Sequence, residues 1–285
     1  MTRQPVVARR AESLLGSAVV ATAPVAGGDI ATATKLRLSD GTTALMKTHP
    51  HPPEGFFAAE VRGLRWLADA GGVPVPEVLG ADEECVILRW VEPGKPTADA
   101  AAGFGQALAT THRAGAASYG LDQDGYIGRL PLPNEPAPTW AEFYAVRRVL
   151  PYLRLGRDRG AISTSQAATI EAAVARLAEL VPEEGPARLH GDLWNGNVLW
   201  GTDARVWVVD PAAHGGHRET DLAMLSLFGM PHLARALDAY LEASPLADGW
   251  RERVGLHQLF PLLVHACLFG GGYAARAAGA AAAFA

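Results

Sequence analysis

Three oxygen-bearing side chains have the types and spacing that phosphoryl transfer requires. Asp192 and Asn197 lie five residues apart, and with His190 they form the pattern H-x-D-x-x-x-x-N. Asp210 follows 18 residues after Asp192, at the end of the apolar run 206–209. In phosphoryl transfer one carboxylate faces the acceptor hydroxyl, while a second acid and an amide hold Mg²⁺, which prefers oxygen ligands. A polar turn would explain Asp192 alone, but the joint pattern predicts a phosphotransfer site.

A lysine for the phosphates and a glutamate to hold it are also required. Lys47 ends an apolar run, which makes a solvated surface lysine less expected there. Glu60 follows 13 residues later on a predicted helix, where it shares a face with Phe57 and Leu64. This face predicts that Glu60 points inward, although a surface glutamate stays an alternative.

A pair of glycines, Gly27 and Gly28, lies between the first two predicted strands. Glycines at such a turn allow backbone N–H groups to approach a phosphate. The segment lacks the patterns GxGxxG and GxxxxGK[ST], so a plain hairpin turn explains it equally well.

The elements that must position these residues fall into two parts. The first 91 residues predict strands at 18–24, 30–38, 43–48, 77–80 and 85–91, with one helix at 54–70. The rest predicts helices at 97–114, 140–155, 163–180, 219–228, 231–243 and 250–278, and an alanine-rich end, 277–285, that frays. A long polar segment, 115–138, separates the first two of these helices. The chain therefore predicts an α+β fold with a small β-rich lobe and a larger helical lobe.

Composition restricts the partners and the location. The 285 residues carry 25 Lys and Arg against 30 Asp and Glu, and the net charge of −5 argues against a nucleic-acid partner. No run of 18 apolar residues exists, so no membrane partner is expected. Cys85 and Cys267 form no CxxC pair, and the N-terminal segment fits a signal peptide poorly. A reducing cytoplasm is the expected location.

The combined motifs resemble the fructosamine (ketosamine-3-) kinase family. HGDLWxGN at 190–197 carries the tryptophan typical of that family, and DPAxxGxHxExDLA at 210–223 is similar to its metal segment. Further similar segments are YIG at 126–128, WxxFYxxRR at 140–148 and FGxGY at 269–273. The resemblance implies a protein-kinase-like bilobal fold, with an N-lobe at 1–91 and a catalytic C-lobe at 92–285.

The resemblance also implies a role for each residue of the phosphotransfer set. Asp192 would be the catalytic base, and Asn197 and Asp210 would ligate Mg²⁺. Lys47, held by Glu60, would contact the phosphates of ATP.

The adenine and acceptor contacts follow from the same resemblance. The hinge would be Leu88, Arg89, Trp90 and Val91, where the Arg89 carbonyl and the Val91 N–H pair with adenine. The acceptor would contact Trp194, His214, His217 and Glu219, although packing or loop-stabilising roles stay open for all four. His190 and Asp221 would support the catalytic loop.

The function that the resemblance implies is phosphorylation of the sugar 3-hydroxyl of ketosamines, which are Amadori products such as fructosamines and ribulosamines. ATP and Mg²⁺ would be the cofactors, and the acceptor would be a small molecule or protein-linked. The role would be protein deglycation or repair. One alternative is an aminoglycoside- or choline-type kinase, and another is a pseudokinase that serves as a binding module.

Overall fold

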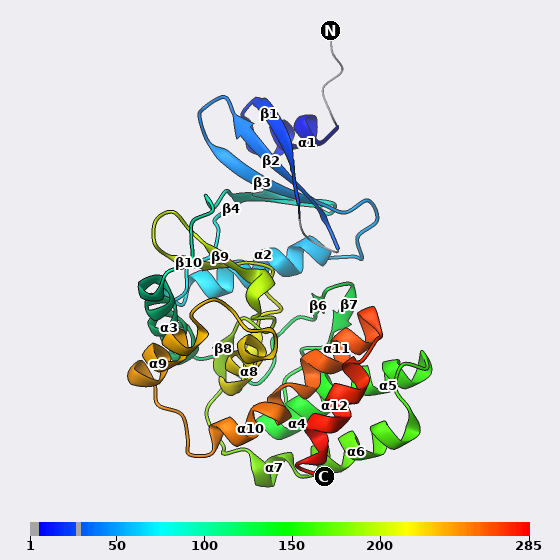
Figure 1. Ribbon diagram of the computed structural model, residues 1–285. Helices are drawn as coiled ribbons and strands as arrows, with labels where there is room; N and C mark the ends of the chain where they lie inside the picture. The colour runs from blue at the N-terminus through cyan, green and yellow to red at the C-terminus, as the bar shows by residue number, and fades with distance from the viewer. Residues whose placement is uncertain (1–5, 27–29) are drawn as a thin grey trace.

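The computed structural model describes residues 6–26 and 30–285, and it shows two lobes that stack one above the other (Figure 1). The upper lobe holds one antiparallel sheet in the order β1-β2-β3-β5-β4. Its strands are β1 (Val19–Val25), β2 (Thr32–Leu38), β3 (Thr43–Thr48), β4 (Val78–Ala81) and β5 (Cys85–Arg89). The predicted strands of this lobe are all present, with ends shifted by a few residues.

Two helices cover the two faces of this sheet. Successive strand residues point to opposite faces, so Met46 and Ile87 pack under α1 (Val6–Leu15), whereas Val86 and Leu88 pack on α2 (Phe56–Ala68). The prediction of a single N-lobe helix was incomplete, because α1 was not foreseen. Its apolar residues recur at helical spacing over only 10 residues, and the two that are buried, Ala8 and Ala11, are small.

The lower lobe is mainly helical. Its long helices are α3 (Ala98–Arg113), α5 (Leu150–Asp158), α6 (Thr164–Ala175), α8 (Glu219–Phe228), α9 (Leu233–Ala243), α10 (Trp250–His257), α11 (Leu259–Phe269) and α12 (Tyr273–Ala282). Shorter ones are α4 (Trp140–Phe143), the π-turn η1 (Tyr144–Val149), α7 (Leu177–Leu180) and the 3-10 turn η2 (Asn195–Asn197). The predicted boundary between the lobes falls in the segment that joins β5 to α3, and it stays a prediction.

Short strands in this lobe position the loops near the other lobe. They form three antiparallel pairs: β6 (Gly125–Ile127) with β7 (Leu130–Leu132), β8 (Ala187–Leu189) with β11 (His214–Gly216), and β9 (Val198–Trp200) with β10 (Val206–Val208). The polar segment 115–138 therefore contains a hairpin, which the sequence did not predict.

The C-terminal region corrects two expectations. The helix predicted at 250–278 is three helices, because the chain turns at Gln258 and again at Gly270 and Gly271, whose φ angles are +68° and +65°. The end does not fray as predicted, since α12 continues to residue 282 and buries Ala277 and Ala281 against the lobe core. None of the helices in the described ranges is both long and apolar enough to cross a membrane.

Candidate active site

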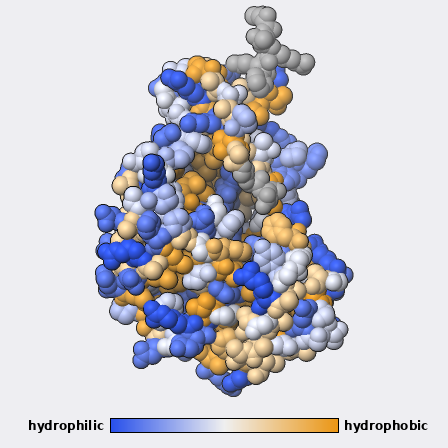
Figure 2. Space-filling view, viewed as in Figure 1, coloured by the Kyte–Doolittle hydropathy of each residue, from blue (hydrophilic) through white to orange (hydrophobic). Residues whose placement is uncertain are grey.

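A cavity of about 540 Å³ separates the two lobes. Figure 2 shows this hollow, with hydrophobic residues on its walls. Apolar side chains line its upper part, from Val25, Ala33, Leu45 and Leu88 of the sheet, and Leu199 faces them from the lower lobe. Charged and amide groups from both lobes, Lys47 and Glu60 from the upper and Asp192, Asn197 and Asp210 from the lower, also line the cavity. A volume of this size accepts a nucleotide-sized ligand, with the apolar part suited to a flat aromatic ring.

The loop between β8 and β9 carries the central carboxylate of the cavity. Asp192 is partly buried, and it receives hydrogen bonds from the Asn197 amide at 2.8 Å on its carbonyl and 3.0 Å on Oδ2. Burial raises the pKa of Asp192 to about 7, against the opposing effect of the Asn197 hydrogen bond. A carboxylate with this pKa is suited to accept a proton near neutral pH.

Asp221 holds the backbone of this loop from below. Its carboxylate accepts from the backbone N–H of His190 at 2.8 Å and of Gly191 at 2.9 Å. Burial alone would raise the pKa of Asp221, but hydrogen bonds from His112 and Gly191 outweigh it and lower the pKa. His190 also holds the backbone of this loop, because its Nδ1 accepts from the Asp192 N–H and its Nε2 donates to the Val209 carbonyl.

Gly191 is required at this position. Its φ is +81°, and a Cβ there would lie 2.1 Å from the Ala212 carbonyl oxygen. Sequence reasoning missed His112 and Tyr240, which bond to each other at 2.8 Å and place the His112 Nε2 3.2 Å from Asp221. Their only sequence signal is a polar side chain on an otherwise apolar helix face, which does not identify its partner.

Lys47, Glu60 and Asp210 meet across the cavity. The Lys47 ammonium donates to Glu60 at 2.7 Å and also forms an ion pair with Asp210. Burial would lower the pKa of Lys47, but the two carboxylates raise it, so the amine stays charged. The prediction that Lys47 and Glu60 pair with each other agrees with this geometry.

Asp210 and Asn197 occupy the same side of the cavity. Asp210 follows β10 with a φ of +55°, a conformation that few residues other than glycine adopt, and its side chain is exposed. The Asn197 carbonyl accepts from the Val209 N–H at 3.0 Å, which ties the two segments together. Carboxylate and amide oxygens beside a cavity that also contains a lysine are a donor set that fits Mg²⁺ and phosphate.

His214, His217 and Glu219 do not line this cavity. They are buried at 3%, 1% and 3% exposure, and the Glu219 carboxylate is held by Arg253 at 2.5 and 3.0 Å. The expectation that they contact the acceptor is therefore not met, because each faces the lobe core. Glu219 lies close enough to His217 and His257 to share a metal, but Arg253 already neutralises its charge.

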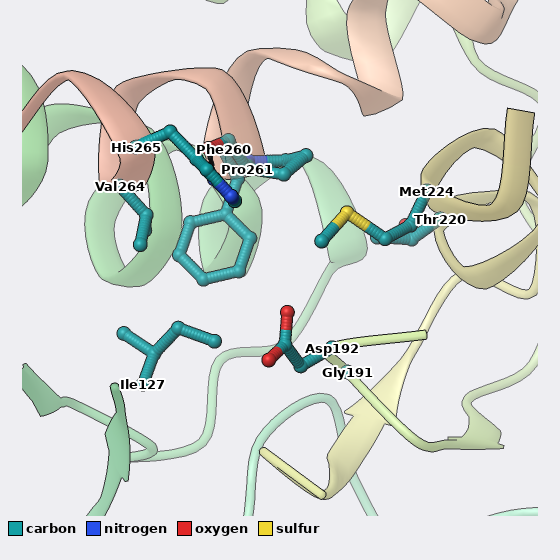
Figure 3. Close-up of a pocket in the computed structure, with 9 residues that line it drawn as sticks. All are labelled: Ile127, Gly191, Asp192, Thr220, Met224, Phe260, Pro261, Val264 and His265. Atoms are coloured by element: carbon teal, nitrogen blue, oxygen red, sulfur yellow. Dashed lines mark hydrogen bonds between the residues drawn. The ribbon is translucent and has the colours of Figure 1, made fainter. Parts of the chain in front are cut away.

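A wall of apolar and aromatic side chains stands beside Asp192. Figure 3 shows its carboxylate pointing into a small hollow between Ile127 and Met224 and facing the Phe260 ring. Pro261, Val264 and His265 complete this wall. His265 was not foreseen, because a single histidine in an apolar helix carries no signal for a cavity.

Trp194 lines the same cavity as Asp192. Its ring packs edge-on against Phe228 at 5.6 Å and covers Gly196, where a Cβ would lie 2.3 Å from the indole. The tryptophan therefore combines the predicted position at the cavity with a packing contact.

The predicted hinge residues join the two lobes. The Arg89 side chain bonds Glu77 at the surface, and the Trp90 N–H donates to the Thr43 carbonyl at 3.1 Å. Leu88, directly before them, lines the cavity. Gly27 and Gly28 lie outside the described residues.

Comparisons with known proteins agree with this geometry. The family model described as fructosamine kinase matches residues 4–283. A probable ketoamine kinase from Thermus thermophilus is 37% identical over 88% of each chain, and one from Enterococcus faecium is 34% identical over 89% of this chain and 91% of its own.

Solved structures extend the comparison to the fold. A fructosamine-3-kinase candidate from Thermobifida fusca is 49% identical and superposes with a TM-score of 0.93 over 98% of both chains. A macrolide 2'-phosphotransferase from Brachybacterium faecium, at 18% identity, superposes with a TM-score of 0.59 over 98% of this chain and 96% of its own. The second likeness confirms the predicted kinase-like phosphotransferase fold. Because the family match spans almost the whole chain and the curated relatives match over most of their length, the chain belongs to the fructosamine kinase family and is an ATP-using kinase.

Proposed function

We propose that this kinase phosphorylates the 3-hydroxyl of small-molecule or protein-linked ketosamines, and that it serves protein deglycation. The observation that carries the proposal is the position of Asp192, which lies in one cavity with Lys47, Asn197 and Asp210 and beside the aromatic side chain of Trp194. Membership of the fructosamine kinase family supports a ketosamine as the acceptor. The names of the curated relatives state the same substrate class.

The charged residues of the cavity divide the work of phosphoryl transfer. ATP with Mg²⁺ supplies the transferable phosphoryl group and neutralises part of its charge. In our proposal Asn197 and Asp210 hold the metal, and Lys47 contacts the α- and β-phosphates. Glu60 keeps the Lys47 ammonium pointed into the cavity. The hinge backbone at Arg89, Trp90 and Val91 and the glycines Gly27 and Gly28 would complete the nucleotide site.

Asp192 acts on the acceptor in this mechanism. Its carboxylate orients the attacking sugar hydroxyl and takes its proton as the oxygen bonds to the γ-phosphorus and the bond from that phosphorus to the leaving ADP oxygen breaks. The apolar wall around it, formed by Ile127, Met224 and Phe260, restricts water at this carboxylate and so limits hydrolysis of ATP.

Trp194 and His265 are the proposed acceptor contacts in this chain. Both line the cavity, and their flat rings suit packing against a sugar ring or the apolar carrier of the amine. They replace His214, His217 and Glu219 in our assignment, because those residues are buried in the lobe core.

An ADP-release panel tests the substrate class. Purified enzyme with Mg·ATP is offered fructosyl-lysine, ribulosyl-lysine, an aminoglycoside and choline, and each rate is compared with the rate without acceptor. We expect both ketosamines to raise ADP release far above that background, and the other two compounds to leave it unchanged. Preferred turnover of the aminoglycoside or choline would overturn the ketosamine assignment, and no turnover of any acceptor would favour a binding module.

A further inference from the structure

The hairpin segment, residues 120–134, is fixed to the lower lobe at its base. The Asn134 N–H donates to the Asp124 carboxylate at 2.7 Å, which closes the segment on itself. The buried Arg148 donates to the Asn134 amide oxygen at 2.6 Å, and the Tyr152 hydroxyl donates to the Pro131 carbonyl at 2.7 Å. These bonds anchor the base of the segment and its second strand to the C-lobe.

The first strand of the same segment and the residue before it reach helix α2 of the upper lobe. The Tyr126 hydroxyl donates to the Glu54 carbonyl at 2.9 Å, next to the start of α2. The Arg62 guanidinium on α2 donates to the Asp124 carbonyl at 2.9 Å. The rings of Tyr126 and Phe56 pack with their centroids 5.3 Å apart. Three contacts thus connect one helix of the N-lobe to one hairpin of the C-lobe.

Helix α2 also carries Glu60, one turn beyond Phe56, and Glu60 bonds to Lys47 at 2.7 Å. A hydrogen bond weakens steeply once its atoms separate by a few tenths of an ångström beyond its normal length. A small shift of α2 would therefore release Lys47 from Glu60. The contacts of the hairpin segment lie on both sides of Glu60 along the helix, at Phe56 and at Arg62.

The hairpin segment also forms part of the acceptor side of the cavity. Ile127 lines the small hollow that the Asp192 carboxylate enters, as Figure 3 shows. Gly128, at the turn, lies against Leu268 of the lower lobe and Ile30 of the upper lobe, with a built Cβ 3.1 and 3.7 Å from their side chains. A molecule bound beside Asp192 would therefore contact the same segment that holds α2.

We propose that the hairpin segment couples the acceptor site to the nucleotide site, with Tyr126 and Arg62 as positioning residues for the Lys47–Glu60 pair. An occupied acceptor site restrains the hairpin, the hairpin restrains α2, and the nucleotide meets a lysine that is already in place. Coupling of this kind is reciprocal, so the nucleotide tightens acceptor binding by the same factor. The acceptor half of this inference rests on the proposed function, whereas the nucleotide half does not.

The first test measures nucleotide binding without any acceptor. Calorimetry gives the Kd of adenylyl imidodiphosphate with Mg²⁺ for the wild type, Tyr126→Phe, Arg62→Met and the double variant. We expect the double variant to bind about fivefold more weakly, with each single variant shifted in the same direction by less. Arg129→Ala is the matched control, because the hydrogen bond that this arginine makes among the described residues lies within the C-lobe, at the Leu268 carbonyl.

Two readouts separate positioning from general stability. Tyr126→Phe removes a hydroxyl whose partner is the Glu54 carbonyl, so a weaker Kd in this variant cannot come from a lost phosphate contact at Arg62. Thermal unfolding is measured for every variant, because a purely structural role would lower Tm and leave the Kd unchanged. An unchanged Kd in the double variant would overturn the proposal.

The second test adds fructosyl-lysine to the same titrations. We expect it to tighten binding of the analogue severalfold in the wild type and in Arg129→Ala, but not in the double variant. Fructosyl-lysine that binds the wild type without tightening the analogue would overturn the coupling. Fructosyl-lysine that fails to bind would overturn the ketosamine assignment instead, and the nucleotide titrations would still decide the role of the hairpin.

Discussion

At the scale of single residues, one carboxylate performs the proposed chemistry and a second one holds it in place. Asp192 reaches the cavity, while Asp221 lies at 1% exposure and binds the backbone on which Asp192 stands. The pKa of Asp192 is raised and that of Asp221 is lowered, although Asp192 lies on the loop to which Asp221 of α8 is hydrogen-bonded. Hydrogen bonds to the charged form explain the difference, because Asp221 accepts several of them from buried donors.

Replacement of Asp192 by Asn tests its role directly. The amide keeps the shape but cannot accept the hydroxyl proton, so we expect kcat to fall by about 10²–10⁴-fold. The Kd of Mg·ATP should change little, because Lys47 and Asp210 are unaltered. Asp238→Asn, an exposed aspartate on α9, is the control and should keep full activity. Near-normal turnover of Asp192→Asn would remove this residue from the chemistry.

At the scale of elements, the close crossing of α3 and α9 supports the loop that carries Asp192, through His112 and Tyr240. Gly105 makes this crossing possible, because a Cβ there would lie 2.0 Å from the Ala236 carbonyl oxygen. The loop near Asp192 therefore depends on a helix contact that lies outside the cavity.

Two glycines of α3 give opposite predictions for stability. Gly105→Ala forces the helices apart, so we expect the free energy of unfolding to fall by about 2 kcal/mol. Gly103→Ala, two residues earlier, points into open space and should instead raise it by about 0.5–1 kcal/mol, because alanine favours the helix. Urea denaturation of both variants measures these values. Equal effects at the two positions would contradict the packing argument.

The sequence predicted most elements where a local pattern determines the structure. The resemblance to the kinase family predicted that Lys47 and Glu60 pair, and the apolar residues beside Lys47 and the apolar face of α2 were consistent with that pairing. Contacts between distant segments were missed, because no local pattern encodes them. Arg62 and Tyr126 are 64 residues apart in the sequence. Neither spacing nor composition indicates that both take part in the contact between α2 and the hairpin segment. The bond of His112 to Asp221 was missed for the same reason.

At the scale of the whole molecule, a buried ion pair links α8 to α10 and affects stability in acid. Burial works against ionisation of Glu219, but hydrogen bonds from His257 and Arg253 lower its pKa to about 2, from an ordinary 4.5. Because the folded-state pKa is lowered, its stabilisation is complete above about pH 4.5. It is lost as the pH falls towards 2, when the folded state also takes up the proton.

Glu219→Gln tests this pH dependence. The wild type should exceed the variant in free energy of unfolding at pH 7, and the difference should shrink by on the order of 3 kcal/mol as the pH falls from 4.5 towards 2. Glu219 also raises the pKa of the buried His217 and His257, so the titration of these histidines contributes to the measured difference. Urea denaturation across this range, wherever both proteins remain folded, gives the values. A difference that stays constant with pH would contradict the assignment.

The two lobes form one site because residues from both line a single cavity. The N-lobe contributes Lys47 and Glu60, and the C-lobe contributes Asp192, Asn197 and Asp210. The net charge of −5 thus includes carboxylates gathered where a metal and phosphates would bind.

The product of the reaction tests the central claim most directly. Fructosyl-lysine is incubated with enzyme and Mg·ATP, and phosphorus–proton correlation NMR identifies the oxygen that carries the new phosphate. We predict one phosphate ester on the 3-hydroxyl of the sugar, formed in equal amount to ADP. Unmodified fructosyl-lysine beside hydrolysed ATP, or phosphate on another hydroxyl, would contradict the account.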